Sequence, residues 1–241
     1  MDVLRLSFKT YYENEWKVKL ARPEYQTIER RWRSRWQFAA ENIEANTVVL
    51  DVACGDGVLG ELLMQEKNCK VYGIDLSDYA INLSRERGVI AEYCDMSEDR
   101  FPFEDNTFDY ITMLCSIEHI IDPVHAIREA KRVLKPGGKM IITLPNAVNV
   151  KNRIAFALGK VPIDLLHIKP GEGMHIQFFN YKDEFESRIL NKIEGLTIEK
   201  KIGDLKNPKA YSEGYRKFYG ALIKAFPNLF SEYVHWIISK N

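Results

Sequence analysis

The chain has 241 residues, and its 34 basic and 34 acidic side chains give it a formal net charge of zero. A balanced charge provides no overall field that would attract nucleic acid or an anionic membrane, and no apolar run approaches the length of a membrane span. The first residues lack an unbroken apolar core and a small-residue cleavage pattern, so we expect no secretory signal and a cytoplasmic protein.

The cysteines offer no evidence for a disulfide framework. No two of them form a C-x-x-C pair, so neither paired disulfides nor a structural zinc site is expected. We predict four small buried thiols and no metal site, at Cys54, Cys69, Cys94 and Cys115.

The residues ahead of the first strand are predicted to form a long helix over about 24–45. Apolar residues recur there at steps of three and four positions, which places them on one face of a helix. We expect residues 1–45 as a whole to form an N-terminal helical cap. The apolar face comprises Ile28, Trp32, Trp36, Ala39 and Ile43.

From residue 46 onward, strand-like apolar runs alternate with helical patterns. Such alternation predicts a parallel sheet with helices on both faces. Ser77 or Asp78 is expected to cap the helix after the second strand, and a proline begins the helix at 122–134. The KPGG sequence at 135–138 is predicted to be a turn. The strands are expected at 47–52, 70–76, 89–94, 108–115 and 139–145.

The last third of the chain follows a different pattern. A helical piece at 147–158 leads into a long loop with two histidines, and loops of this length are usually functional. Two late strands are expected at 196–202 and 232–240, and the last one is predicted to run antiparallel at the edge of the sheet. We divide the single domain 1–241 after the cap into a core at 46–146, an insertion at 147–180 and a C-terminal part at 181–241.

The bend after the first strand carries the strongest chemical signal. Its sequence is VLDVACGDGVLGELL, residues 48–62, and it contains the pattern G-x-G-x-x-G that usually holds a dinucleotide pyrophosphate. However, Asp51 ends the strand and Asp56 lies between the first two glycines, and a phosphate disfavours nearby anions. S-adenosylmethionine carries a sulfonium and an ammonium group and no phosphate, so it suits this loop better than NAD does.

Acidic residues also end the next two strands. Asp75 follows Gly55 by 20 residues, where a carboxylate can accept hydrogen bonds from ribose hydroxyls. NAD enzymes use the same device, so Asp75 does not distinguish the two cofactors. Asp95 is suited to accept from an adenine amino group, and the Met96 side chain is suited to pack on the ring.

Four ordered motifs resemble the class I S-adenosylmethionine-dependent methyltransferases, and more narrowly their small-molecule branch, which includes ubiquinone-biosynthesis-type and methionine-biosynthesis-type enzymes. The motifs are VLDVACGDG, VYGIDLS, CDMSEDRFPFEDNTFDYITMLCSIEHI and LKPGGKMIITLPN. The resemblance is strong over about 45–146 and continues weakly through HIQFFNYKDEFESRI to the end. Gly60 is a departure that the family does not require, and we assign it to helix–strand packing.

The resemblance implies a Rossmann-like, seven-stranded, mostly parallel α/β sheet with helices on both faces and the last strand antiparallel. It implies S-adenosylmethionine as cofactor and S-adenosylhomocysteine as product. Within the site, the loop from Ala53 to Gly57 should face the methionine part, and Leu76 should pack on adenine. The implied cofactor residues are Asp51, Ala53, Cys54, Gly55, Gly57, Asp75, Leu76, Asp95, Met96, Leu114 and Cys115.

Candidates for proton transfer follow the fourth strand. His119 in SIEHI lies where sheets of this type bind ligands, and its ordinary pKa is close to neutral. Glu118 and His119 are alternatively a brace for the following helix, and His175 either lines the acceptor pocket or fixes the loop; His167 is a weaker candidate. Some ubiquinone-type relatives place a metal at E-x-x-E-H, but Cys115 stands here where the first glutamate would be, so we expect no metal.

Arginines gather in the N-terminal cap and indicate an acceptor that carries negative charge. A guanidinium is a permanent planar charge suited to carboxylate or phosphate, although a solvated helix face is the plainer explanation. We expect a small-molecule acceptor, with anionic or sugar- and phosphate-bearing metabolites favoured, and a monomer or homodimer. The arginines are Arg22, Arg30, Arg31, Arg33 and Arg35.

Three other functions remain open from the sequence. An NAD-dependent oxidoreductase or epimerase would use the same glycine pattern, and a binding protein would keep the fold without catalysis. A nucleic-acid methyltransferase is disfavoured by the neutral charge and by the absence of an Asn/Asp-Pro-Pro-aromatic motif. The favoured reaction is methyl transfer to oxygen, or alternatively to nitrogen.

Overall fold

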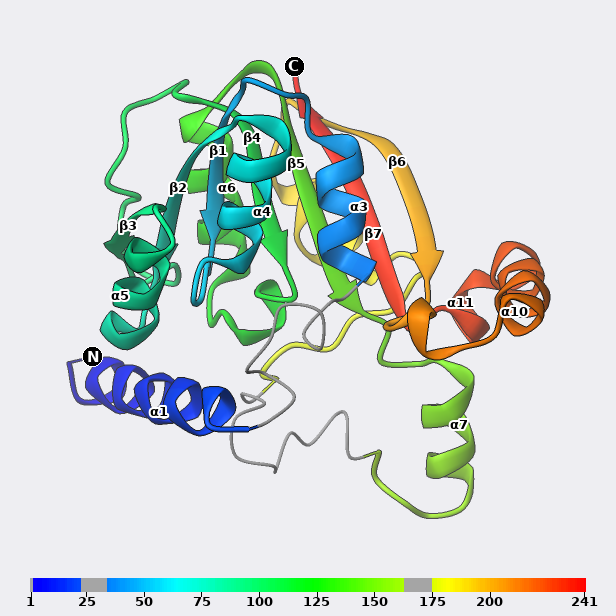
Figure 1. Ribbon diagram of the computed structural model, residues 1–241. Helices are drawn as coiled ribbons and strands as arrows, with labels where there is room; N and C mark the ends of the chain where they lie inside the picture. The colour runs from blue at the N-terminus through cyan, green and yellow to red at the C-terminus, as the bar shows by residue number, and fades with distance from the viewer. Residues whose placement is uncertain (1, 23–33, 163–174) are drawn as a thin grey trace.

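A computed structural model describes residues 2–22, 34–162 and 175–241 (Figure 1). Its strands form one sheet of seven, in the order β3-β2-β1-β4-β5-β7-β6. β7 runs antiparallel to β5 and β6, and the pairs from β3 to β5 are parallel. The predicted fold class is therefore confirmed. The strands are β1 (Val48–Val52), β2 (Lys70–Asp75), β3 (Ile90–Tyr93), β4 (Phe108–Leu114), β5 (Leu134–Pro145), β6 (Leu196–Asp204) and β7 (Tyr233–Lys240).

Side-chain caps fix where several helices begin. Ser77 accepts from the Ala80 amide and caps α5, as predicted, and Asp122 accepts from the His125 amide and caps α6. The helices are α1 (Asp2–Leu20), α3 (Ser34–Asn42), α4 (Val58–Lys67), α5 (Asp78–Glu86), α6 (Pro123–Val133), α7 (Val150–Ala157), α9 (Glu184–Arg188), α10 (Glu213–Ala225) and α11 (Pro227–Phe230). Short 3-10 helices are η2 (Ile117–His119), η3 (Leu190–Lys192) and η4 (Pro208–Ala210).

Alternating side chains of the central strands build a core on each face of the sheet. Leu50 and Val52 of β1 join the cluster formed with α6, whereas Val49 between them joins the cluster formed with α3 and α4. Buried apolar side chains thus pack against the sheet from both sides. The carboxyl ends of β1 and β4 are consequently fixed points on which a site can be built.

One local prediction is wrong, and another can be checked only over part of its length. The KPGG sequence at 135–138 is not a separate turn; it lies inside β5, where the register against β4 shifts between Phe108 and Tyr110. The helix expected at 24–45 is described only from Ser34 to Asn42, so Arg30, Arg31 and Arg33 lie outside the described residues. His167 lies outside them as well.

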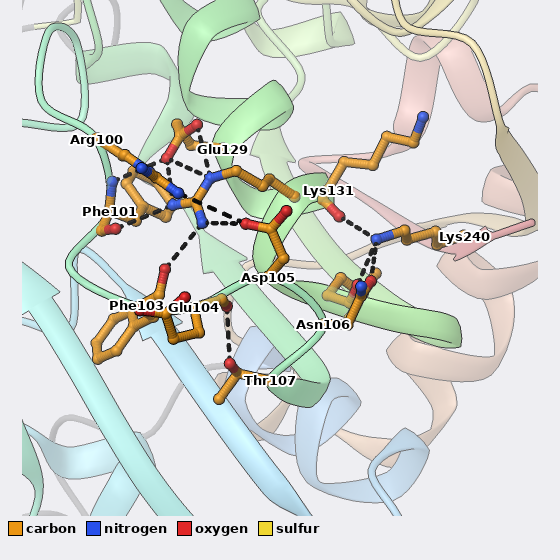
Figure 2. A network of polar contacts seen from close by, with 12 residues as sticks. Arg100, Phe101, Phe103, Glu104, Asp105, Asn106, Thr107, Glu129, Lys131 and Lys240 are labelled. Carbon is orange, nitrogen blue, oxygen red and sulfur yellow. Dashed lines mark hydrogen bonds and ion pairs between the residues drawn. The ribbon is translucent and has the colours of Figure 1, made fainter.

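A polar network holds the connection between β3 and β4 (Figure 2). The guanidinium of Arg132 on α6 donates to the carbonyls of Phe101 and Phe103 at 3.0 and 2.8 Å, and it pairs with Asp105. Lys240 at the end of β7 donates to the Asn106 side chain at 2.7 Å. These bonds anchor the far end of the segment that starts with Asp95 and Met96, so those two residues are held near the sheet.

No helix in the described part of the chain is suited to cross a membrane. Within residues 2–22, 34–162 and 175–241, none combines the length and the apolar character that a span requires.

Candidate active site

A cavity of about 430 Å³ opens at the carboxyl ends of β1, β4 and β5. α1 and α7 lie at this end of the sheet, where the parallel strands finish (Figure 1). Open α/β sheets bind ligands at this edge because the crossovers leave a crevice there. Residues at or just beyond each strand end line the cavity, namely Asp51, Ala53, Cys54 and Gly55 for β1, Leu114 and Cys115 for β4, and Pro145 and Asn146 for β5.

The glycine loop bends through three left-handed backbone positions. Ala53, Gly55 and Gly57 have φ angles of 58°, 56° and 79°. A side chain at Gly55 would overlap the indole of Trp16, and one at Gly57 would come within 2.6 Å of the Ser84 hydroxyl. Glycine is therefore required at both positions, and Trp16 and Ser84 pack directly against the loop backbone.

The third glycine of the motif has a packing role. A Cβ at Gly60 would overlap Val89 and lie 3.2 Å from Val71, so its absence lets α4 lie close to the sheet. The assignment of Gly60 to helix–strand packing is consistent with this contact.

Three buried carboxylates surround the loop, and they differ in their partners. Asp75, which is 6% exposed, accepts from the amides of Gly55 and Ser77 at 2.9 Å each. Asp56 pairs with Arg87 at 3.5 Å, so its charge is offset. Asp51 accepts from the Thr112 hydroxyl at 2.6 Å, and burial raises its pKa to about 7.

These partners decide what the loop can bind. Burial also raises the pKa of Asp75, against the opposing effect of the amides that donate to it. Holding the charged Asp51 carboxylate away from water is unfavourable in free energy. A nearby cation would reduce this unfavourable free energy, whereas a nearby phosphate would increase it. The site thus fits a positively charged nucleoside and disfavours a pyrophosphate.

The residues predicted to hold adenine lie together beyond the second and third strands. Leu76, Asp95 and Met96 are all buried, and the Asp95 carboxylate accepts from the Ser97 amide at 2.9 Å. Among the described residues, the cavity lining does not include these three, nor Gly57 and Asp75. The cavity therefore adjoins the residues predicted for the methionine part and for the acceptor, whereas the residues predicted for adenine are covered.

α1 lies over this covered end. Lys9 pairs with Asp78 at 2.5 Å and stacks over the Tyr93 ring, and the Glu13 carboxylate accepts from the Tyr79 amide at the start of α5. Trp16 contacts Gly55 and lines the cavity. The predicted N-terminal cap thus contributes directly to the site.

The three predicted catalytic residues form one cluster. The rings of His119 and His175 are 4.8 Å apart at their centroids, and His175 Nε2 lies 3.9 Å from Glu118 Oε1. The backbone carbonyl of Glu118 accepts from the amides of Ile176 and Gln177, so the segment that carries His175 is fixed to η2. His175 therefore lines the cavity on a segment that the Ile176 and Gln177 amides hold in place.

Glu118 is the most buried member of this cluster, at 1% exposed. Neither of its carboxyl oxygens meets an ordinary hydrogen-bond geometry with any described residue. Burial raises its pKa to about 8, although its own backbone amide and Arg35 act in the opposite direction. Glu118, His119 and His175 also place ligand atoms within 4.8 Å of one another, so the cluster can hold a divalent cation or move a proton.

Arg35 reaches the same cavity from α3. Its guanidinium donates to the Tyr233 hydroxyl at 3.1 Å, and its buried Nε has no hydrogen-bond partner among the described residues. Cys115 lies nearby, with its pKa raised to about 12 by burial, so it is a neutral thiol and not a nucleophile.

Several residues of the site were not identified from the sequence. Tyr233 begins β7, and it was missed because only the antiparallel pairing of β7 with β5 brings it here. Trp16 was missed because no periodic pattern marked α1. Asn146 follows β5 directly, so its position at the carboxyl end of a strand was the signal that could have identified it.

Comparison with known proteins finds methyltransferases. The family described as "Methyltransferase domain" matches residues 50–142. A ubiquinone biosynthesis O-methyltransferase of Pseudomonas paraeruginosa is 30% identical over 170 residues, covering 68% of this chain and 70% of the relative. The same enzyme of Xanthomonas euvesicatoria is 32% identical over 183 residues, covering 72% and 73%.

Solved structures share the fold at low sequence identity. Geranyl diphosphate C-methyltransferase from Streptomyces coelicolor, a complex with S-adenosylhomocysteine, has a TM-score of 0.61 at 16% identity and covers 93% of this chain and 86% of that one. An S-adenosylmethionine-dependent methyltransferase from Archaeoglobus fulgidus has a TM-score of 0.57 at 17% identity, with 98% of both chains covered.

Proposed function

Since the chain belongs to the class I S-adenosylmethionine-dependent methyltransferases, we propose that it transfers the methyl group to a hydroxyl oxygen of a small anionic molecule. One observation carries this proposal. A cluster of the buried Glu118 with the half-buried His119 and His175 lines the same cavity as the cofactor loop. Relatives named O-methyltransferases support oxygen over nitrogen as the reacting atom.

The residues of the chain would divide the work between binding and proton transfer. Asp75, Asp95 and Met96 would hold the nucleoside, and the loop at 53–57 with Leu114 would hold the methionine part. When bound, S-adenosylmethionine supplies an activated methyl carbon, whose bond to sulfur breaks as the acceptor oxygen bonds to it. His119 would take the proton from the acceptor hydroxyl. Glu118, once ionised above its pKa of about 8, would stabilise the resulting positive charge through His175.

A small acceptor suits the available space. The cavity of about 430 Å³ is near the lower end of the range for ligand pockets, and the methionine part of the cofactor occupies some of it. Phe178, an exposed aromatic residue of the lining, offers a ring on which the acceptor can stack.

Negative charge on the acceptor follows from the balance of charges in the cavity. The Arg35 guanidinium is permanently charged, while Glu118 with a pKa of about 8 is mostly neutral at pH 7. Lys206 also lines the cavity, and Lys151 there pairs with Glu232. A carboxylate or phosphate on the acceptor would complete the hydrogen bonding of Arg35.

Transfer of an isotope-labelled methyl group tests this proposal with matched probes. We expect labelling of 3,4-dihydroxybenzoate over catechol, or of glucose 6-phosphate over glucose, because only the first of each pair carries an anion. Replacing Arg35 with methionine should raise KM for the anionic probe about ten-fold or more, since charged hydrogen bonds are lost. Arg35→Lys should retain part of the preference.

The matched control is Arg153→Met, because Arg153 is exposed on α7 and its guanidinium donates to the Val148 carbonyl of its own segment. We expect it to leave KM unchanged, and thermal unfolding checks that Arg35→Met is folded. Equal methyl transfer to the neutral and anionic probes would contradict the proposal that the acceptor is anionic. If no hydroxyl compound is methylated, a binding protein without catalysis is favoured.

Asp51 gives the cofactor site a predictable pH dependence. Its pKa of about 7 means that the carboxylate is lost as pH falls below 7, and with it the attraction for a cation. Calorimetry should therefore show affinity for S-adenosylmethionine falling between pH 8 and pH 6 by about ten-fold, one factor of ten per unit below the pKa. Asp51→Asn should bind weakly and independently of pH in this range; an unchanged slope would assign the effect to another group.

A further inference from the structure

α1 presents one face to the site and anchors itself with a neighbouring one. Lys9 and Glu13, one turn apart, bind Asp78 and the Tyr79 amide at the start of α5. Tyr12 and Trp16 are likewise four residues apart and therefore point to the same side of the helix. Trp16 contacts Gly55 of the cofactor loop, so the side chain of Tyr12 belongs to the face that covers the site.

The Tyr12 hydroxyl is a buried polar group that protein contacts leave unused. It has no hydrogen-bond partner within residues 2–22, 34–162 and 175–241. The Tyr12 ring meets the His119 ring edge-on, with centroids 6.2 Å apart. Burial raises the pKa of Tyr12, so the phenol keeps its proton. A buried hydroxyl without a partner is costly unless a ligand completes it.

The surroundings of this hydroxyl indicate which part of the ligand it meets. The Tyr12 ring meets His119 of the proposed acceptor cluster, and Trp16, one turn further along the same face, contacts Gly55, whose amide donates to Asp75. This face of α1 therefore reaches from the acceptor cluster toward Asp75. The proposed function has the ribose at Asp75 and the acceptor at Glu118 and His119. The covalent structure of the cofactor then determines which of its atoms lies between the ribose and the acceptor. It is the sulfur, which is joined to the ribose and carries the methyl group.

We propose that Tyr12 contacts the sulfonium centre of the bound cofactor, and that its hydroxyl oxygen gives the site a preference for the charged cofactor over its neutral thioether product. The lone pairs of the hydroxyl oxygen attract the positive sulfonium and the polarised methyl group. After transfer the sulfur is neutral and this attraction ends. The contact thus helps to hold the reactive cofactor and to release S-adenosylhomocysteine.

Calorimetry on the full chain with S-adenosylmethionine and S-adenosylhomocysteine tests this proposal. Tyr12→Phe removes only the oxygen and keeps the ring against His119. We expect it to weaken S-adenosylmethionine binding about five-fold, the size of one net hydrogen bond, and to change S-adenosylhomocysteine binding less than about two-fold. Tyr11→Phe is the matched control, because its ring is adjacent to Tyr12 while its position one residue earlier on α1 directs it to a different side of the helix.

Two outcomes would overturn the proposal. Unchanged affinity for both compounds would show that the oxygen contacts neither, and an equal loss for both would place it on a part that the two compounds share. Neither measurement needs an acceptor, so failure here is separate from failure of the proposed acceptor or of His119 as the base. Unfolding curves of both variants confirm that the fold is retained.

Discussion

Replacing Asp75 with alanine is expected to weaken binding of S-adenosylhomocysteine by about 100-fold or more. The carboxylate of Asp75 accepts from the Gly55 and Ser77 amides, so its loss releases the loop and also removes the ribose acceptor. A hydrogen bond to a charged group contributes about 1.5 to 3 kcal/mol. The loss of two such bonds accounts for the expected loss of affinity of about 100-fold. Isothermal titration calorimetry measures the change directly.

Asp78→Ala is the matched control for this substitution. Asp78 lies three residues further on and its side chain is 58% exposed, with Lys9 as its partner. Its removal should change cofactor affinity only a few-fold, because an exposed ion pair contributes little. Equal losses in the two variants would mean that Asp75 acts through general loop stability and does not contact the ribose.

Replacing His119 with glutamine is expected to lower kcat for methyl transfer by about 100-fold or more, the usual contribution of a positioned base. The binding of S-adenosylhomocysteine should stay within a few-fold, because the cofactor loop is untouched. A loss of cofactor affinity that equals the loss of rate would instead assign His119 to binding. Labelled methyl transfer to the preferred probe gives the rate, and calorimetry gives the affinity.

The same cluster sets the pH dependence of the reaction. Glu118 has a pKa of about 8, so the rate should rise with pH as the cluster loses its proton, and level off above pH 8. Glu118→Gln should be slow and should lack this step. A retained step near pH 8 in Glu118→Gln would assign the titration to a different group.

The thermal stability of the protein should fall as pH rises, whereas the rate of methyl transfer should rise. A carboxyl whose pKa is higher in the folded state than in the unfolded state binds more protons when folded, so wild-type stability falls as pH rises toward 8. Glu118→Gln avoids this cost and should unfold at a higher temperature than wild type above pH 8, with the difference disappearing near pH 4.5.

A chelator should leave the wild-type rate of methyl transfer unchanged, because Cys115 stands where an oxygen ligand of a metal would be. A loss of rate that a divalent cation reverses would instead show a metal-dependent reaction.

The sequence identified the parts of the site that are local in the chain. The loop at 53–57 and the carboxylate of Asp75 follow buried strands, and the carboxyl ends of parallel strands always meet at one edge of the sheet. The cluster of Glu118 and His119 was predicted for the same reason, because it follows β4 directly.

The remaining parts depend on packing between distant segments, which local patterns do not encode. Tyr233 pairs with Arg35 across 198 positions, and this depends on the antiparallel return of β7. The position of Tyr12 depends on how α1 packs against α5, through a single turn of charged contacts. The displaced pKa of Glu118 could not be predicted either, because it arises from burial.

A crystal structure with S-adenosylhomocysteine tests the arrangement of the site most directly. We predict that the ribose hydroxyls bond to Asp75, that adenine lies against Met96 with Asp95 at its edge, and that the sulfur faces His119 inside the cavity. A nucleoside bound away from Asp75, or a sulfur directed away from the cluster of Glu118, His119 and His175, would contradict the account.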